Sequence, residues 1–299
     1  MKGRWLAPLA AMGLALATVP GAAEEPLPPE MQKAVAAAKD LKPQQGRIAL
    51  DQAHASLDLG KTYDFYGPAD AKKILVDIWG NPPEAADGVL GVVMPAGKSP
   101  LSDSWGAVLT YEATGYVEDD DAKDADFTTI LDDLKKATEE ANPGRKSQGY
   151  PEMHVSGWAE APRYDPSSHS VVWARDLAIE GNTVHTLNYD LRTLGRSGVL
   201  SANFIAGMPD LPSIKTAAAD FARHAAFDSG ARYADFDPSL DEKAEYGIGG
   251  LVAAGVGVAA AKKLGLLALF AKFLKPILIA VVAAFAAIAR FGKRLIGRE

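Results

Sequence analysis

Apolar residues recur at intervals of three or four positions in several stretches of the chain, which is the spacing of a helix with one buried face. One stretch begins at Pro68, a residue favoured in the first helical turn, and ends at Gly80. Another follows Asp126, a helix-capping residue, and reaches Asn142-Pro143-Gly144, a combination that normally ends a helix. The pattern predicts helices over residues 30–41, 68–79, 126–141 and 214–227.

Short runs rich in β-branched and aromatic residues alternate with turn sequences through residues 46–238. After residue 153 they follow one another closely, separated by turns such as Glu180-Gly181-Asn182 and Gly195-Arg196-Ser197-Gly198. Close spacing with tight turns predicts an antiparallel meander. The expected strands are residues 47–50, 55–59, 89–94, 105–111, 154–159, 170–175, 183–191 and 199–206. The predicted fold class is therefore α+β, a mainly antiparallel sheet with packed helices, followed by a C-terminal transmembrane helical segment.

Residues 1–23 have the pattern of a secretory signal peptide. Lys2 and Arg4 form a basic start, an apolar run follows to Val19, and Gly21-Ala22-Ala23 supplies the small residues of a cleavage site. An uncleaved anchor is the alternative, although the run is short for a spanning helix. Residues 24–45 are expected to form a flexible lead-in with one short helix, and residues 46–238 to form the soluble domain.

The C-terminal quarter of the chain is apolar and ends in a basic tail. Residues 247–291 are dominated by Gly, Ala and larger apolar side chains, and residues 292–299 form the tail. Small residues let membrane helices pack closely, so the apolar stretch is predicted to anchor the protein in a membrane. Ser239 and Glu242 fit a capping box, which predicts a connecting helix over residues 239–246 that runs straight into the anchor.

Two topologies of this anchor remain open. A single crossing by residues 264–289 leaves the basic tail inside but buries Lys272 and Lys275 near the middle of the bilayer. A hairpin with residues 262–275 at the inner surface avoids burying these lysines. The hairpin shortens both limbs, however, and leaves the basic tail outside.

The charge distribution restricts the partners of the domain. The chain has 299 residues, no Cys and a net charge of −7, and its basic residues gather at the two ends. Residues 24–246 consequently hold 21 basic and 37 acidic residues, a net charge of −16. A domain this acidic repels phosphates, so nucleic acid is not expected as a partner. Together with the two terminal segments, this predicts a protein of the bacterial inner membrane with its soluble domain in the periplasm.

Several short motifs resemble those of one bacterial family. They are Gly157-Trp158-Ala159-Glu160-Ala161-Pro162-Arg163-Tyr164-Asp165, Leu194-Gly195-Arg196-Ser197-Gly198-Val199-Leu200 and Tyr233-Ala234-Asp235-Phe236-Asp237-Pro238, with Gly115-Tyr116-Val117 upstream. The family is domain of unknown function 2167, whose members are predicted to be membrane-anchored. The resemblance covers residues 46–290 and implies export and membrane anchoring, but it implies no activity.

The meander carries an aromatic and basic set that is the first candidate for a binding site. Trp and Tyr rings beside Arg side chains can line a groove for a polymer, a peptide or a carboxylate. The alternative is an ordinary core with Arg stems packed over it. The set consists of Trp158, Arg163, Tyr164, Trp173, Tyr189, Arg192 and Arg196.

Carboxylates at alternate positions form a second candidate, a divalent metal site. Asp235, Asp237 and Asp241 have the spacing of ligands in a calcium loop, but Leu240 stands where that loop needs Gly. The alternative is a turn with a helix cap. The acidic run of residues 118–126 has two similar interpretations, a loose cation site or a solvated loop that ends in a helix cap.

No histidine pair, nucleophile elbow or phosphate-binding loop indicates a known chemistry, and no cofactor is expected. The sequence therefore predicts a membrane-anchored envelope protein whose domain binds an envelope protein or polymer. One alternative is an envelope hydrolase that uses paired carboxylates or a divalent metal, with Asp235, Asp237 and Asp241 as its first candidates. Another is a scaffold that self-associates through the glycines of its apolar segment.

Overall fold

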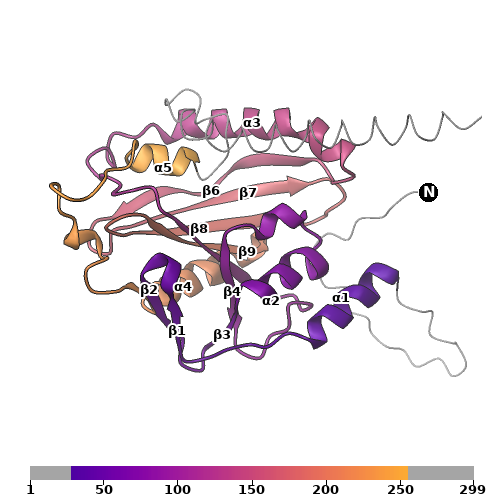
Figure 1. Ribbon diagram of the computed structural model, residues 1–299. Helices are drawn as coiled ribbons and strands as arrows, with labels where there is room; N and C mark the ends of the chain where they lie inside the picture. Colours follow the sequence, from indigo (N-terminus) through magenta and orange to yellow (C-terminus); the bar gives the residue numbers. More distant parts are fainter. Residues whose placement is uncertain (1–27, 255–299) are drawn as a thin grey trace, which may run out of the picture.

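A seven-stranded antiparallel sheet forms the centre of the protein (Figure 1). The structure is a computed structural model and describes residues 28–254. The strand order is β3-β4-β5-β9-β8-β7-β6, and every neighbouring pair is antiparallel. The strands are β3 (Tyr63–Tyr66), β4 (Val89–Pro95), β5 (Gly106–Glu112), β6 (Met153–Asp165), β7 (Ser170–Ile179), β8 (Thr186–Leu194) and β9 (Val199–Gly207).

The last four strands form the meander that the turn sequences predict. β6 pairs with β7, β7 with β8 and β8 with β9, each in sequence order. The turn between β8 and β9 is closed by a bond from the Gly195 amide to the Gly198 carbonyl, 2.8 Å long. β9 then pairs with β5, which joins the meander to the N-terminal strands. The predicted α+β class with a mainly antiparallel sheet is confirmed.

One face of this sheet is covered by a second, smaller sheet and by α4 (Leu211–Phe221). The small sheet has the order β1-β2-β10, from β1 (Arg47–Leu50), β2 (Ala55–Asp58) and β10 (Ala225–Phe227). Leu57, Phe204, Ile214 and Phe221 are all buried in the core between these layers. The helix predicted to reach residue 227 ends earlier because Ala225–Phe227 pairs with β2 as a strand.

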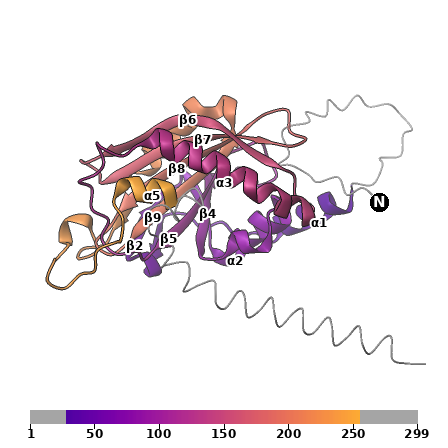
Figure 2. The ribbon, with the colours of Figure 1, turned by 90° about the horizontal axis from the view of Figure 1, so that it is seen from above.

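Helices lie over parts of the opposite face. α2 (Pro68–Lys72) continues into a π-helical segment (Lys73–Ile78), and together they pack on β3 and β4. α3 (Phe127–Ser147) and α5 (Ile248–Ala254) lie side by side over the other end of the sheet (Figure 2). The remaining helical elements are α1 (Pro29–Lys39) and the 3-10 turns Asp51–Ala53, Pro83–Ala86, Met208–Asp210 and Tyr233–Asp235.

The lead-in predicted as flexible contains the expected short helix, and part of it belongs to the domain. α1 packs on the π-helical segment, and Lys33 forms an ion pair of 2.8 Å with Asp77. Gln44 then bonds through its backbone to Phe65 of β3. The domain was predicted to begin at residue 46, but these contacts show that residues before 46 also pack on it.

The helix predicted to stop at residue 141 continues through Pro143 to Ser147. Asn142 donates to the carbonyl of Met153 and accepts from the amide of the same residue, each at 2.9 Å. Arg145 adds a bond to the carbonyl of Pro151 at 3.0 Å. These contacts with the start of β6 hold the last turn in place, and they outweigh the local tendency of Asn-Pro-Gly to end a helix.

The predicted connecting helix over residues 239–246 is wrong. Residues 239–246 form no helix beyond one turn at residues 238–240, and α5 begins only at Ile248. Ser239 does not cap a helix here, because its amide and hydroxyl both donate to the carboxylate of Asp237. Asp237 and Ser239 form an Asx turn in place of the predicted helix start.

The first part of the predicted membrane anchor also belongs to the domain. Ile248, Leu251 and Val252 of α5 are fully buried, in a cluster that includes Val117 and Trp173. Residues 255–291 of the predicted anchor and the predicted signal peptide lie outside the described residues. Within residues 28–254, no helix has the length and apolar character needed to cross a membrane.

A carboxylate from the acidic run starts α5. Asp121 accepts the amide of Ile248 at 2.7 Å and the amide of Gly249 at 3.0 Å. The approach requires glycine at position 247, since a Cβ there would lie 2.4 Å from an oxygen of Asp121. Gly247 and Gly249 thus admit a cap that comes from 127 residues away in the sequence.

Asp121→Ala is expected to lower the free energy of unfolding by about 1–2 kcal/mol, because two amides at the start of α5 lose their acceptor. Urea unfolding of the full chain in detergent, followed by tryptophan fluorescence, measures the change. Asp124→Ala is the matched control, as it removes an exposed aspartate from the same run. Equal losses in the two variants would contradict the capping role.

Candidate functional site

In the part of the chain that the structure describes, the middle of one sheet face is left open between the helices. On the central strands β5 and β9, Ala107, Leu109, Ala202 and Phe204 point to the covered face and are buried. Several residues that alternate with them are only half-buried, among them Val108, Thr110, Asn203 and Ile205. Alternation along a strand separates the two faces, so one face is sealed and the other is partly accessible.

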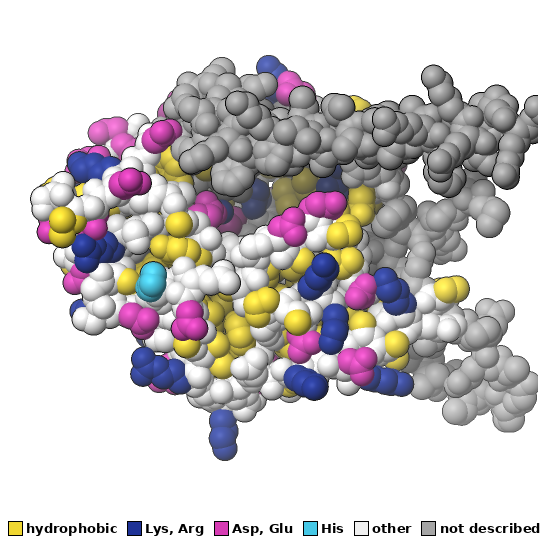
Figure 3. Space-filling view, viewed as in Figure 1, with side chains coloured by type: hydrophobic (Ala, Val, Ile, Leu, Met, Phe, Trp, Pro, Cys, Tyr) yellow, Lys and Arg dark blue, Asp and Glu magenta, His cyan; other side chains and the backbone are white. Residues whose placement is uncertain are grey.

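The open face forms what we call the central groove. The cluster formed by α2 and the π-helical segment flanks it over Val92 and Met94, and the cluster containing α5 flanks it over Trp173 and Val171. Figure 3 shows a hollow above the α2 region, with acidic and basic side chains visible inside it. The strand register brings the floor residues together: Val108, Thr110, Glu112, Arg175, Asn188, Asp190, Arg192, Ser201, Asn203 and Ile205.

Four charged side chains form an alternating chain across this floor. Arg175 donates to Asp190 at 3.1 Å, and Arg192 lies 3.8 Å from the other oxygen of Asp190. Arg192 also donates to Glu112 of β5 at 2.8 Å. Asp190 and Arg192 are buried, whereas the Glu112 side chain is 39% exposed. Buried charges are tolerated where they are paired in this way.

Amide side chains extend the polar floor beside these charges. Asn188 and Asn203 exchange two hydrogen bonds, each 2.9 Å long, between β8 and β9. Arg175 also donates to the side-chain oxygen of Asn188. Asn188 and Asn203 are both half-buried, so they face the opening as well as each other.

Several buried donors beside the floor have no hydrogen-bond partner among the described residues. They are the Nε of Arg175, the Nε of Arg192, the indole nitrogen of Trp173 and the hydroxyl of Ser201. The guanidinium of Arg192 lies 5.3 Å from the ring centroid of Trp173, which fixes it by a cation–π contact. Unpaired buried polar groups are few in folded proteins, so four grouped in one place are candidates to bind a polar ligand or ordered water.

The predicted aromatic and basic set is divided by the structure. Trp173 and Arg192 belong to the central groove, and Trp173 lies fully buried beneath Arg192. Arg163 pairs in register with Val172, and Tyr189 with Ala174, so both lie on the opposite sheet face. Burial there raises the pKa of Tyr189 to about 12.

The other members of the set are structural contacts. The indole of Trp158 donates to the carbonyl of Phe127 at 3.1 Å, at the start of α3. The hydroxyl of Tyr164 donates to Asp119 at 2.6 Å, and burial together with this bond raises the pKa of Tyr164. These residues hold the helix layer and the acidic run on the sheet, and they do not line one groove with Tyr189.

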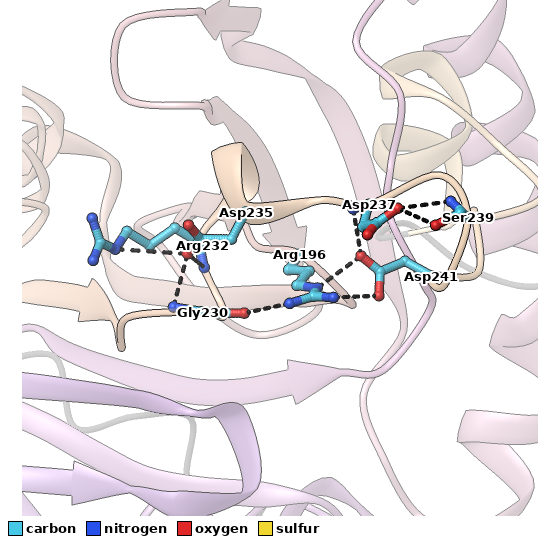
Figure 4. Close-up of polar contacts among 7 residues, drawn as sticks. All are labelled: Arg196, Gly230, Arg232, Asp235, Asp237, Ser239 and Asp241. Atoms are coloured by element: carbon cyan, nitrogen blue, oxygen red, sulfur yellow. Dashed lines mark hydrogen bonds and ion pairs between the residues drawn. The ribbon is translucent and has the colours of Figure 1, made fainter.

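Arg196 instead fastens the segment that leads to α5, residues 228–247, which we call the strap. Its guanidinium donates to both oxygens of Asp241, at 2.7 and 2.9 Å, and to the carbonyl of Gly230 (Figure 4). The hydrogen bonds from Arg196 lower the pKa of Asp241. The amide of Asp237 bonds to the same carboxylate at 2.7 Å, so one ion pair organises the turn.

Stacked rings hold the same strap from the side. Tyr116 stacks on Tyr233 with ring centroids 4.4 Å apart and on Phe236 at 3.8 Å, and His169 stacks on Tyr233 at 4.3 Å. The hydroxyl of Tyr233 donates to the carbonyl of Val117 at 3.0 Å. The motifs that carry the family resemblance therefore meet at this end of the sheet.

The three aspartates proposed as metal ligands do not converge. Asp235 accepts hydrogen bonds from the amides of Gly230 and Arg232. Asp237 instead accepts a hydrogen bond from the amide of Ser239 (Figure 4). In residues 28–254 there is no group of three or more Asp, Glu or His side chains placed to hold a metal ion. The acidic run is likewise used for structure, since Asp126 caps α3 and Glu118 pairs with Lys243.

Sequence reasoning missed most of the groove. Arg175, Asn188, Asp190, Ser201 and Asn203 were not among its candidates. The available signal was the run Asn188, Asp190, Arg192, polar residues at every second position of a strand expected to lie inside the sheet. A central strand with a polar face is unusual unless that face is accessible or carries a site.

The fold and the groove define the class, an α+β domain with one sheet face open between helices. Residues 42–286 match the sequence model of the family described as Protein of unknown function (DUF2167). The chain therefore belongs to this family, and the resemblance drawn from its motifs is confirmed. None of the curated proteins compared with the chain matches it.

One similar solved structure is the solution structure of cyanobacterial PsbP (CyanoP) from Synechocystis sp. PCC 6803. The two are 10% identical, and the match covers 63% of this chain and 94% of that chain with a TM-score of 0.35. A likeness this weak carries no argument about function.

Asp190→Asn is expected to lower the free energy of unfolding by about 3–5 kcal/mol, because the buried Arg192 and the half-buried Arg175 lose their shared counter-ion. Denaturant unfolding of the full chain measures it. Glu118→Gln serves as the matched control, since it breaks an ion pair with Lys243 in which both side chains are about half exposed, and it should change stability by less than about 1 kcal/mol. A loss for Asp190→Asn as small as the control would contradict the buried charge chain.

Proposed function

We propose that the domain is a non-enzymatic binding module whose ligand lies in the central groove. One observation carries the proposal. The centre of the sheet, normally the best-buried part of such a fold, leaves polar residues only half-buried on one face, and beside them lie buried donors without partners in residues 28–254. Binding sites combine a concave surface with a few convergent polar groups, and the groove has both.

The hydrolase alternative has less support. Its nominated carboxylates, Asp235, Asp237 and Asp241, are each engaged by protein donors. The carboxylates of the groove, Asp190 and Glu112, are each paired with an arginine. Because both carboxylates are already engaged by an arginine, these residues suit recognition better than proton transfer.

The proposal places the domain in the bacterial envelope, on the grounds of sequence alone. Residues 1–23 support export, and residues 255–291 retain enough apolar length to support anchoring in the inner membrane. The groove would then face the periplasm, where an envelope protein or polymer can reach it.

Export gives the first prediction of this proposal. Protease added to spheroplasts of a bacterium that expresses the full chain should degrade the domain, because the domain lies outside the inner membrane. A cytoplasmic marker protein in the same sample must survive as the control. Survival of the domain alongside that marker would contradict the periplasmic location.

Ligand binding gives the second prediction. A photoreactive residue at Thr110, in the groove floor, should form a specific crosslinked product in intact cells. The matched control is Thr216, which is exposed on α4 at the opposite face of the sheet. Mass spectrometry identifies the products. The same products from both positions, or no product from Thr110 in folded protein, would contradict the groove as the binding site.

A further inference from the structure

The ion pair between Arg192 and Glu112 joins a cation that is held in place to a carboxylate that another anion could replace. The Arg192 side chain is 9% exposed and is held by the ring of Trp173, by Asp190 and by its place on a central strand. Glu112 is the last residue of β5, and its side chain is 39% exposed. Water therefore reaches the carboxylate side of this pair, while the guanidinium side stays in place.

Glu112 accepts only one hydrogen bond from the guanidinium of Arg192. One nitrogen of Arg192 donates to Glu112 at 2.8 Å, and the other terminal nitrogen lies 3.8 Å from Asp190, beyond hydrogen-bond distance. The Nε has no partner among the described residues. An arginine fork can bind both oxygens of one carboxylate through two parallel bonds. A carboxylate that is not tethered to β5 can therefore satisfy Arg192 better than Glu112 does.

We infer that the ligand of the central groove carries a carboxylate that replaces Glu112 on Arg192. This inference rests on the proposed function and specifies its ligand. The floor without Glu112 holds Arg175 and Arg192 against Asp190 alone, so it has one unmatched positive charge for an incoming anion. Glu112 then acts as a stand-in that keeps Arg192 paired while the groove is empty.

The partner is an extended peptide segment with an isolated carboxylate. The half-buried amides of Asn188 and Asn203 lie on the same floor, and each amide nitrogen has a second N–H, beyond the one given to the other Asn, that can donate to a peptide carbonyl. A polyanion is disfavoured, because residues 24–246 carry a net charge of −16. A single acidic side chain or a chain terminus on an otherwise neutral peptide avoids that repulsion.

Chemical rescue tests the inference. Glu112→Ala leaves Arg192 buried without its carboxylate, and acetate added to the full-length variant in detergent should bind in the vacated position. At a concentration about ten times its dissociation constant, acetate should raise the thermal midpoint by roughly 3–5 °C over sodium chloride of equal ionic strength. Acetamide, which has the same shape without the charge, should give no rise.

Matched variants make the outcome specific. Glu160→Ala breaks the ion pair with Lys215 on the opposite face. Acetate should raise the thermal midpoint of this variant no more than it raises that of the wild type. If Glu112→Ala does not fold, Glu112→Gln replaces it in the same titration. Acetate that stabilises the Glu112 and Glu160 variants equally, or neither of them, would overturn the inference.

A second arm tests the peptide. The blocked peptide Gly-Gly-Asp-Gly-Gly should stabilise Glu112→Ala at lower concentration than acetate, and its Asn counterpart should not. An Asp peptide no better than acetate, or a carboxylated polysaccharide that is better than the peptide, would overturn the peptide assignment. Crosslinking from Thr110 remains an independent readout. A crosslinked partner without acetate rescue would support the groove as the binding site and contradict only the inference that the ligand carries a carboxylate.

Discussion

The open face of the sheet depends on the interactions that stabilise the buried guanidinium of Arg192. A guanidinium cannot give up its proton in a protein, so its burial at the centre of a sheet requires a counter-charge and an aromatic support. Asp190 and Glu112 supply the charge, and Trp173 supplies the support. Asp190 in turn pairs with Arg175, and Arg175 bonds to Asn188. The polar floor thus extends outward from one residue, through strands that the meander already holds in register.

Much of the fold could be predicted from the sequence, because the meander is local. Alternating residues and tight turns fix which strand follows which, and β6 to β9 pair in that order. The short strands β3 and β10 escaped prediction because their partners are distant: Phe65 pairs with Val93, and Ala225 with Leu57. A strand of three or four residues has too little local pattern to be recognised without its neighbour.

The prediction errors near the C-terminus have the same cause. Ser239 and Glu242 form a good local capping pattern, but the bond between Arg196 and Asp241 spans 45 residues and holds the strap in turns. The glycines from position 247 suggested a membrane helix, whereas Gly247 is there to admit Asp121. For the groove, the sequence pointed to Arg192 and Trp173. Which sheet face stays open depends on where α2, α3 and α5 come to lie, and no local pattern encodes that.

Trp173 connects the two features of the molecule that carry functional interest. Its ring supports Arg192 in the groove, and the same side chain packs in the cluster with Ile248, Leu251 and Val252 of α5. α5 is the last described element before the long apolar segment, so the groove floor and the attachment point of that segment share one buried side chain. Well-packed interiors transmit displacements because they have no free volume to absorb them. Arg192 and the element that precedes the predicted anchor are therefore supported by the same buried ring.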